Sequence, residues 1–194
     1  MYRYLLLVVL LLAGCDSQTQ EYNAALAHMA NRDLQRALPV LTALAEAGYA
    51  PAQFRLGMMF AEGAGIQQNL RQAALWFERA AQQGNVGAQW TLARLYRTGL
   101  GVRKSDSLAL RWYQQLAEQG FAPAQYQAGM MYREGLGTSR DLAQAEYWLR
   151  QAAERDFRPA MAEMVRAYLE GGLGLPVDPA QAQAWRERAQ IRAF

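Results

Sequence analysis

The chain is poor in the residues from which catalytic and metal-binding sites are built. It has one cysteine and one histidine among its 194 residues, so it can form neither an internal disulfide nor a metal site with several histidines. No Ser-His-Asp arrangement can be assembled around His28. We therefore expect His28 to be structural or solvated, and we predict no catalytic residue, no metal and no cofactor.

Long apolar runs, strand patterns and blocks of like charge are also missing. The apolar run Leu5–Leu12 has eight residues, whereas a helix that spans a bilayer needs ~20. β-branched residues are scarce, and no useful alternation of apolar and polar residues predicts a strand. The net charge is +3, with basic residues scattered among acidic ones, so nothing favours nucleic-acid binding. An all-α protein is the expectation.

What the chain does contain is a repeat. Copies with a period of 36 residues occupy residues 52–87, 88–123, 124–159 and 160–194. Their tryptophans are spaced by 36, 36 and 37 residues: Trp76, Trp112, Trp148 and Trp185. Self-similarity at a period of this size is typical of a solenoid, in which stacked neighbours complete a core that no single repeat can enclose.

Each copy reads as helix, glycine turn, helix. The first helix carries small or apolar residues at repeat positions 1, 5, 8, 9 and 12, which share a face at ~100° per residue. A pair of glycines follows, and then a residue suited to cap the second helix: Asn69, Ser105, Asp141 or Asp178. In the second helix an alanine precedes the tryptophan by three positions, so both should face the core.

Residues 21–51 form an incomplete first copy. A helix is expected at about Glu21–Ala30, and Asn31, Arg32 and Asp33 replace the glycine pair. Pro39 indicates that the next helix bends or begins late. With this pair the domain covers residues 21–194 and contains five helix pairs.

The pattern A-x-x-x-L-G-x-x-Y-x-x-G-x-G, followed by a cap, A-x-x-W and A-A-x-x-G, resembles the Sel-one-like repeat, a relative of the tetratricopeptide repeat. The copies at 52–87 and 124–159 match it best. The resemblance implies a right-handed alpha-alpha superhelix. The best-matching copy contributes these residues: Ala124, Gly129, Tyr132, Gly135, Gly137, Asp141, Ala145, Trp148, Ala152 and Ala153.

The N-terminus has the character of a secretory signal. Leu12, Ala13, Gly14 and Cys15 form a box similar to that of bacterial lipoproteins, in which the matching cysteine receives lipid, including palmitate, and begins the mature chain. Residues 1–14 are then the signal peptide and 15–20 a polar tether. The resemblance implies a protein anchored in the bacterial envelope and facing the periplasm. Asp16 resembles an inner-membrane retention residue, but the choice between inner and outer membrane stays open.

Positions 4, 7 and 11 of each first helix lie within ~60° of one another, away from the apolar stripe. The resemblance implies that first helices line the concave side of the solenoid, where a protein or peptide would bind. An ordinary solvated face is the other interpretation. The residues predicted to bind a partner are Arg55, Met58, Thr91, Arg94, Gln127, Met130, Glu163 and Arg166.

These patterns favour a lipid-anchored, monomeric scaffold or adaptor. An enzyme or binder acting on peptidoglycan or β-lactams is an alternative, because cysteine-rich relatives have been linked to such substrates. Those relatives have paired cysteines in each repeat, which this chain lacks. A third alternative is contact with cell-wall polysaccharide, with Trp90 and Tyr126 as platforms.

Overall fold

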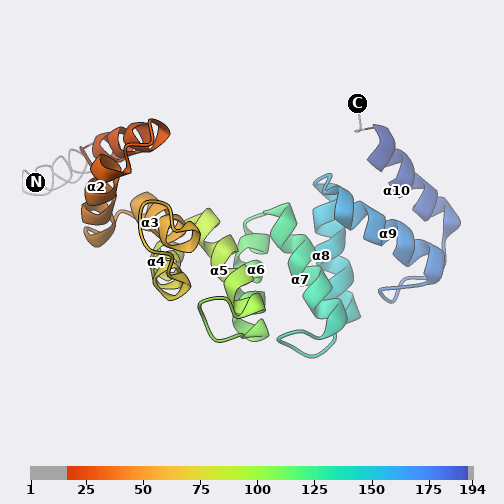
Figure 1. Ribbon diagram of the computed structural model, residues 1–194. Coiled ribbons are helices and arrows are strands. Elements are labelled where there is room, and N and C mark those ends of the chain that lie inside the picture. The colour runs from red at the N-terminus through yellow and green to blue at the C-terminus, as the bar shows by residue number, and fades with distance from the viewer. Residues whose placement is uncertain (1–16, 192–194) are drawn as a thin grey trace, which may run out of the picture. The chain divides into compact units, whose positions relative to one another are not determined.

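The protein is helical throughout the part that the structure, a computed structural model, describes, which is residues 17–191. An N-terminal helix covers residues 17–30. Within the described residues it is followed by helices of 13 residues each and by no strand (Figure 1). They are α2 (Leu34–Glu46), α3 (Ala50–Glu62), α4 (Leu70–Gln82), α5 (Val86–Thr98), α6 (Asp106–Glu118), α7 (Ala122–Glu134), α8 (Leu142–Glu154), α9 (Arg158–Glu170) and α10 (Pro179–Ile191).

The helices form the predicted pairs. In each 36-residue copy the first helix is α3, α5, α7 or α9, and the second is α4, α6, α8 or α10. Successive helices pack on one another, for example α7 on α8 and α9 on α10. The prediction of an all-α chain of helix-turn-helix repeats is confirmed.

The predicted capping residues begin the second helices. The side chain of Asn69 accepts hydrogen bonds from two backbone N–H groups of the first turn of α4, both at 3.1 Å. Ser105 and Asp141 each accept one in the same way. Asp178 accepts two at 3.0 Å at the start of α10. These oxygens satisfy N–H groups that have no partner inside a helix, which sets where each second helix starts.

The glycine pair shapes the turn between the two helices of a copy. Gly135 ends α7 in the left-handed conformation, with φ of 69°, which glycine adopts without a Cβ penalty. Gly137 also has a positive φ, 76°, and a Cβ there would lie 2.4 Å from the backbone oxygen of Asp106. The turn after α7 therefore lies directly against the first residue of α6, in the preceding repeat.

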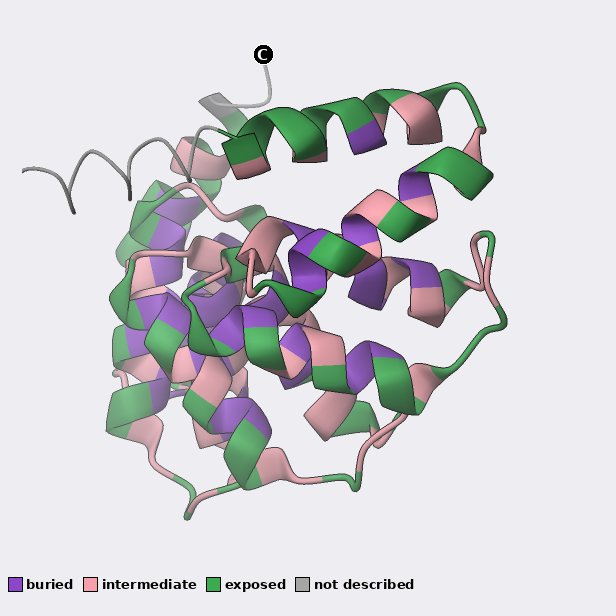
Figure 2. Ribbon diagram, turned by 90° about the vertical axis from the view of Figure 1, so that its left-hand side faces the viewer, coloured by how far each residue is buried: buried purple, intermediate pink, exposed green. Residues whose placement is uncertain are grey.

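The helices carry buried residues on some of their sides and exposed residues on others (Figure 2), and nearly all of the buried residues are apolar. The chain divides into an N-terminal unit, up to Gln89 with Leu100–Val102, and a C-terminal unit, Trp90–Gly99 with the chain from Arg103 onward. One cluster, around Leu41 and Leu56, belongs to the N-terminal unit. Two more, one around Tyr113 and one around Leu149, belong to the C-terminal unit.

The predicted buried stripe is largely confirmed. Repeat positions 1 and 5 are buried in every copy, whereas the glycines at position 12 end the first helices and do not continue the stripe. In the second helices the predicted alanines are all buried. Trp148 and Trp185 are buried beside them, while Trp76 and Trp112 are half-buried.

The core also contains a polar residue that the stripe did not include. Glutamine stands at repeat position 2 in three copies and is buried in each. Its side-chain amide donates to the carbonyl of an alanine eight residues earlier, at the end of the preceding second helix. The pairs are Gln53 to Ala45 at 3.0 Å, Gln89 to Ala81 at 3.1 Å and Gln125 to Ala117 at 3.0 Å. A buried amide that makes such a bond ties two repeats together.

The N-terminal copy differs from expectation in two ways. Residues 17–20, predicted to belong to a tether, are helical, because their polar residues contain no helix breaker and Thr19 reaches the hydroxyl of Tyr49 at 3.4 Å. Pro39 lies inside α2, which begins at Leu34, so the helix does not start late. The predicted signal peptide and Cys15 lie outside the described residues. Between residues 17 and 191 no helix combines the length and the apolar character that crossing a bilayer requires.

Candidate functional site

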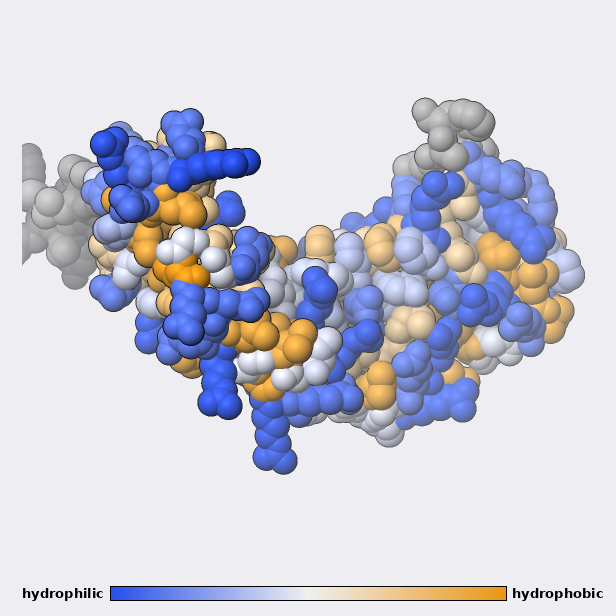
Figure 3. Space-filling model, viewed as in Figure 1, coloured by the Kyte–Doolittle hydropathy of each residue, from blue (hydrophilic) through white to orange (hydrophobic). Residues whose placement is uncertain are grey.

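The eight residues predicted to bind a partner are all accessible to some degree. Arg94 and Arg166 are exposed, and the other six are half-buried. Arg55 and Met58 belong to the N-terminal unit and the rest to the C-terminal unit. Hydrophilic and apolar side chains alternate over the side of the C-terminal unit that Figure 3 shows. The eight predicted side chains are therefore only partly covered by the rest of the protein, and part of each remains accessible.

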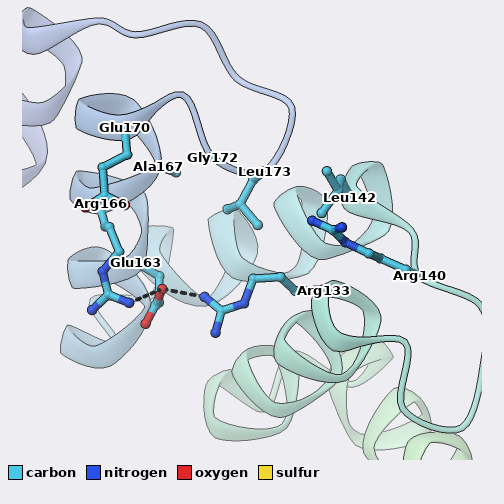
Figure 4. Close-up of a pocket in the computed structure, with 9 residues that line it drawn as sticks. All are labelled: Arg133, Arg140, Leu142, Glu163, Arg166, Ala167, Glu170, Gly172 and Leu173. Carbon is cyan, nitrogen blue, oxygen red and sulfur yellow. Dashed lines mark hydrogen bonds and ion pairs between the residues drawn. The ribbon is translucent and has the colours of Figure 1, made fainter.

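The structure brings Glu163 and Arg166 together in one pocket, which we call the Glu163 pocket. It has a volume of about 200 Å³ and lies between α7, α9 and the segments that follow them. Figure 4 shows the guanidinium groups of Arg133 and Arg166 approaching the carboxylate of Glu163 from different sides. The lining residues are Arg133, Arg140, Leu142, Glu163, Arg166, Ala167, Glu170, Gly172 and Leu173.

Glu163 is the centre of charge in this pocket. Its carboxylate accepts from Arg133 of α7 at 2.7 Å and from Arg166 of its own helix at 3.5 Å. The Glu163 side chain is 12% exposed and that of Arg133 28% exposed, against 58% for Arg166. The short bond to Arg133 is thus shielded from solvent and links two successive first helices, whereas the contact with Arg166 is an exposed pair of little energetic weight.

Arg94 and Gln127 lie in a second pocket of the same unit, the Arg94 pocket. It has a volume of about 210 Å³ and is lined by Trp90, Arg94, Arg97, Thr98, Tyr113 and Gln127. Arg97 of α5 donates to the side-chain oxygen of Gln127 on α7 at 3.5 Å. The ring of Trp90 packs edge-on against that of Tyr113, with centroids 5.3 Å apart. Two cations therefore lie beside an aromatic wall.

The pKa of the Tyr113 hydroxyl reflects both burial and the positive charges of the Arg94 pocket. Burial raises the pKa of its hydroxyl, and the positive charges of Arg97 and Arg94 act in the opposite direction. Tyr113 is buried, whereas Arg94 and Arg97 are exposed, so the tyrosine shields their charge from water on one side only. A positive field in such a place favours an anion.

Sequence reasoning missed Arg97 and Arg133, which stand at repeat position 10. That position is three residues after position 7, so it lies on the same helix face. Arginine at position 10 in two successive copies was the available signal. Each residue contacts position 4 of the next copy, a relation between helices that only the fold reveals.

The remaining predicted residues have other surroundings. Met130 packs against the core cluster around Leu149, and Thr91 is half-buried on α5. Arg55 is half-buried, and its Nε atom has no hydrogen-bond partner among the described residues. The structure therefore gathers four of the eight predicted residues into the two pockets: Arg94, Gln127, Glu163 and Arg166.

The aromatic platforms proposed for polysaccharide are engaged in packing. Trp90 meets Phe121 edge-on at 5.5 Å, and Tyr126 lies 5.5 Å from Phe157. Both are half-buried, and these ring contacts join neighbouring parts of the core. His28 lies 3.7 Å from Asp33, and residues 17–191 contain no group of three or more histidine, cysteine, aspartate or glutamate residues that could hold a metal.

Comparison with known proteins agrees with the repeat geometry. The Sel1 repeat family matches residues 50–85, 86–121, 122–157 and 160–189. The chain is similar to the crystal structure of a Sel1 repeat protein from Oxalobacter formigenes, with a TM-score of 0.79 and 28% identity over 89% of this chain and 71% of that one. No match was found among curated proteins.

A second similar structure is c5321, a protective antigen of uropathogenic Escherichia coli strains with an SLR fold. The TM-score is 0.74 and the identity 36%, over 81% of this chain. This chain spans only 33% of the length of c5321. The likeness to both structures confirms the predicted superhelical solenoid class. Four matched copies cover most of the chain, so the protein belongs to the Sel1 repeat family, whose helical solenoids typically serve as scaffolds for protein interaction.

Proposed function

We propose that the protein is a lipid-anchored scaffold of the bacterial envelope, which holds a partner protein or peptide on its first-helix face. The face is defined by positions 4, 7, 10 and 11 of the first helices. The anchor would be lipid on Cys15, and the solenoid would project from the membrane into the periplasm. In this role the protein supplies a binding surface and no reaction centre.

The observation that carries the proposal is the composition of the two pockets. Arginine, tryptophan and tyrosine are the residues enriched at the energetic centres of protein interfaces. The Arg94 pocket combines Trp90, Tyr113 and two arginines within about 210 Å³. A merely solvated face would carry separate charged side chains over a flat surface, not cations beside a half-buried aromatic wall.

Photo-crosslinking in the producing bacterium tests this function. A photo-reactive phenylalanine analogue placed at Met58 or Met130 should capture a discrete partner. The same analogue at Leu75 or Tyr147, which are exposed on second helices, should not capture it. With Cys15→Ser, the chain should leave the membrane fraction and lose the capture.

Two results would contradict the proposal. Equal capture from the first-helix and second-helix positions would show that the face has no special role. Retention of the Cys15→Ser chain in the membrane fraction would rule out anchoring through that residue.

A further inference from the structure

The two pockets share one equivalent contact from successive repeats, and this contact differs in charge between them. Arg97 and Arg133 are 36 positions apart, and so are the residues that they contact, Gln127 and Glu163. In each case an arginine near the end of one first helix reaches the fourth repeat position of the next first helix. One pocket contains a carboxylate at that place and the other a neutral amide of the same size.

This difference leaves positive charge unbalanced in the Arg94 pocket. Glu163 accepts from Arg133 at 2.7 Å, whereas Gln127 accepts from Arg97 at 3.5 Å. Within residues 17–191, neither Arg94 nor Arg97 forms an ion pair. The two arginines are also three residues apart on α5, so their like charges repel each other.

The surroundings would strengthen an ion pair formed there. Trp90 and Tyr113 wall the pocket, and Tyr113 is only 1% exposed. Arg94 and Arg97 are exposed on the open side of the pocket. The aromatic wall therefore shields an ion pair from water on one side only, which still makes a charge-assisted hydrogen bond stronger than at a flat open surface. The amide nitrogen of Gln127 adds a further donor to the lining.

We propose that the Arg94 pocket binds the carboxylate of a glutamate or aspartate side chain from an acidic segment of the partner. In the neighbouring pocket, Glu163 already occupies the equivalent place as the chain's own carboxylate. This inference rests on the proposed scaffold function and names the chemistry of its partner. The occupant is a side-chain carboxylate because the protein itself shows one bound to Arg133, the residue equivalent to Arg97.

A peptide-binding measurement tests the inference. The full chain, purified in detergent, is titrated at low salt against a fluorescein-labelled, C-terminally amidated peptide of alternating leucine and glutamate, and fluorescence polarisation is recorded. A matched peptide with glutamine in place of glutamate should bind at least about tenfold more weakly, since each charge-assisted bond has roughly that value. Arg94→Gln and Arg97→Gln should each lower the affinity for the acidic peptide by about tenfold.

Two reciprocal variants exploit the repeat. Gln127→Glu gives Arg97 an internal carboxylate like that of Glu163. It should lower the affinity for the acidic peptide by about tenfold or more, although both arginines are kept. Glu163→Gln removes the carboxylate that Arg133 and Arg166 share and leaves Arg133, within residues 17–191, only its contact with Glu134 at 3.6 Å, so a second, weaker binding event should appear in the titration. Arg111→Gln removes the same charge from an exposed position on α6 and should change the affinity less than about twofold.

The outcomes separate this inference from the scaffold function. Equal binding of the glutamate and glutamine peptides would overturn the inference, as would unchanged binding by Gln127→Glu. An effect of Arg111→Gln as large as that of Arg97→Gln would also overturn it, because binding would then follow net charge alone. If Met130 still captures a partner after such a result, the scaffold function stands without this pocket.

Discussion

At the scale of single residues, the buried glutamine of the repeat shows how one polar group joins two repeats. Gln125 is 2% exposed, and its amide nitrogen donates to the carbonyl of Ala117. That carbonyl also accepts from the backbone N–H of Gly120 at 2.9 Å, so it keeps a partner if the glutamine is lost. The last copy has Met161 at this position, buried to 1%. Packing volume here should therefore matter more than the hydrogen bond.

Replacing Gln125 tests whether packing volume contributes more to stability than the hydrogen bond. Gln125→Met should lower the free energy of unfolding by no more than about 1.5 kcal/mol, the net value of one hydrogen bond. Gln125→Ala should lower it by about 2–4 kcal/mol, because it also leaves a cavity between α6 and α7. Urea unfolding followed by circular dichroism measures both. Equal losses for the two variants would show that the hydrogen bond dominates.

At the scale of the element, the second glycine of each turn decides how closely a turn approaches the preceding repeat. Gly137 and Gly174 have nearly the same φ, 76° and 74°. A Cβ at Gly137 would meet the backbone of Asp106 at 2.4 Å, whereas nothing lies within 4 Å of a Cβ at Gly174. The same dihedral strain therefore occurs with and without a steric clash.

Alanine at the two glycines separates strain from clash. Gly174→Ala should lower the free energy of unfolding by about 1–2 kcal/mol, the strain of a left-handed alanine. Gly137→Ala should lower it by about 1–3 kcal/mol more, because the turn must move away from α6. Thermal and urea unfolding provide the comparison. A Gly137→Ala loss no larger than that of Gly174→Ala would show that the turn yields freely.

At the scale of the whole molecule, we expect buried and half-buried tyrosines of the repeats to make the free energy of unfolding fall at alkaline pH. Burial is the largest cause that raises the pKa of Tyr113, Tyr126 and Tyr132 above the usual 10.0. In the unfolded chain these hydroxyls lose their protons near pH 10. The folded state binds the protons more tightly, so this contribution to stability is present below that pH. It is lost as the pH rises through the higher folded values.

Removal of one buried tyrosine hydroxyl should reduce the pH dependence of the free energy of unfolding. The free energy of unfolding should fall above pH ~10, and it should fall less steeply in Tyr113→Phe. Phenylalanine already occupies the equivalent place as Phe77, buried to 1%, so the variant should fold. Tyr147→Phe, at a 48% exposed side chain, is the matched control. Identical pH profiles for the Tyr113→Phe variant and the unaltered protein would contradict the prediction.

The repeat could be predicted from the sequence because each copy contains the same caps, turn glycines and apolar positions. Capping residues such as Asn69 and turn glycines such as Gly135 act on the nearest backbone, so their consequences follow from position alone. The buried alanines follow from helical periodicity in the same way. The buried Gln125 was not predicted, because a polar residue is expected outside unless its partner is known.

The candidate site was predictable only in part. Helix geometry placed Arg94, Gln127, Glu163 and Arg166 on one face of the first helices. In the structure the two arginines are exposed, the other two residues are half-buried, and all four line pockets. That this face binds a partner stays a prediction, as does the lipid on Cys15. The charge difference between the pockets could not be read from one helix, since it depends on groups that are distant in the chain.

The sequence by itself determined that the protein is a row of helix pairs, because period, caps, turns and apolar stripes are short-range properties that recur every 36 residues. Only the tertiary structure decided that Arg133 meets a carboxylate of the next first helix while Arg97 meets an amide. Arg133 and Glu163, like Arg97 and Gln127, are 30 residues apart and meet because the fold brings successive first helices within reach of their long side chains. Coulomb interaction depends on distance in space, and distance in space is set by packing.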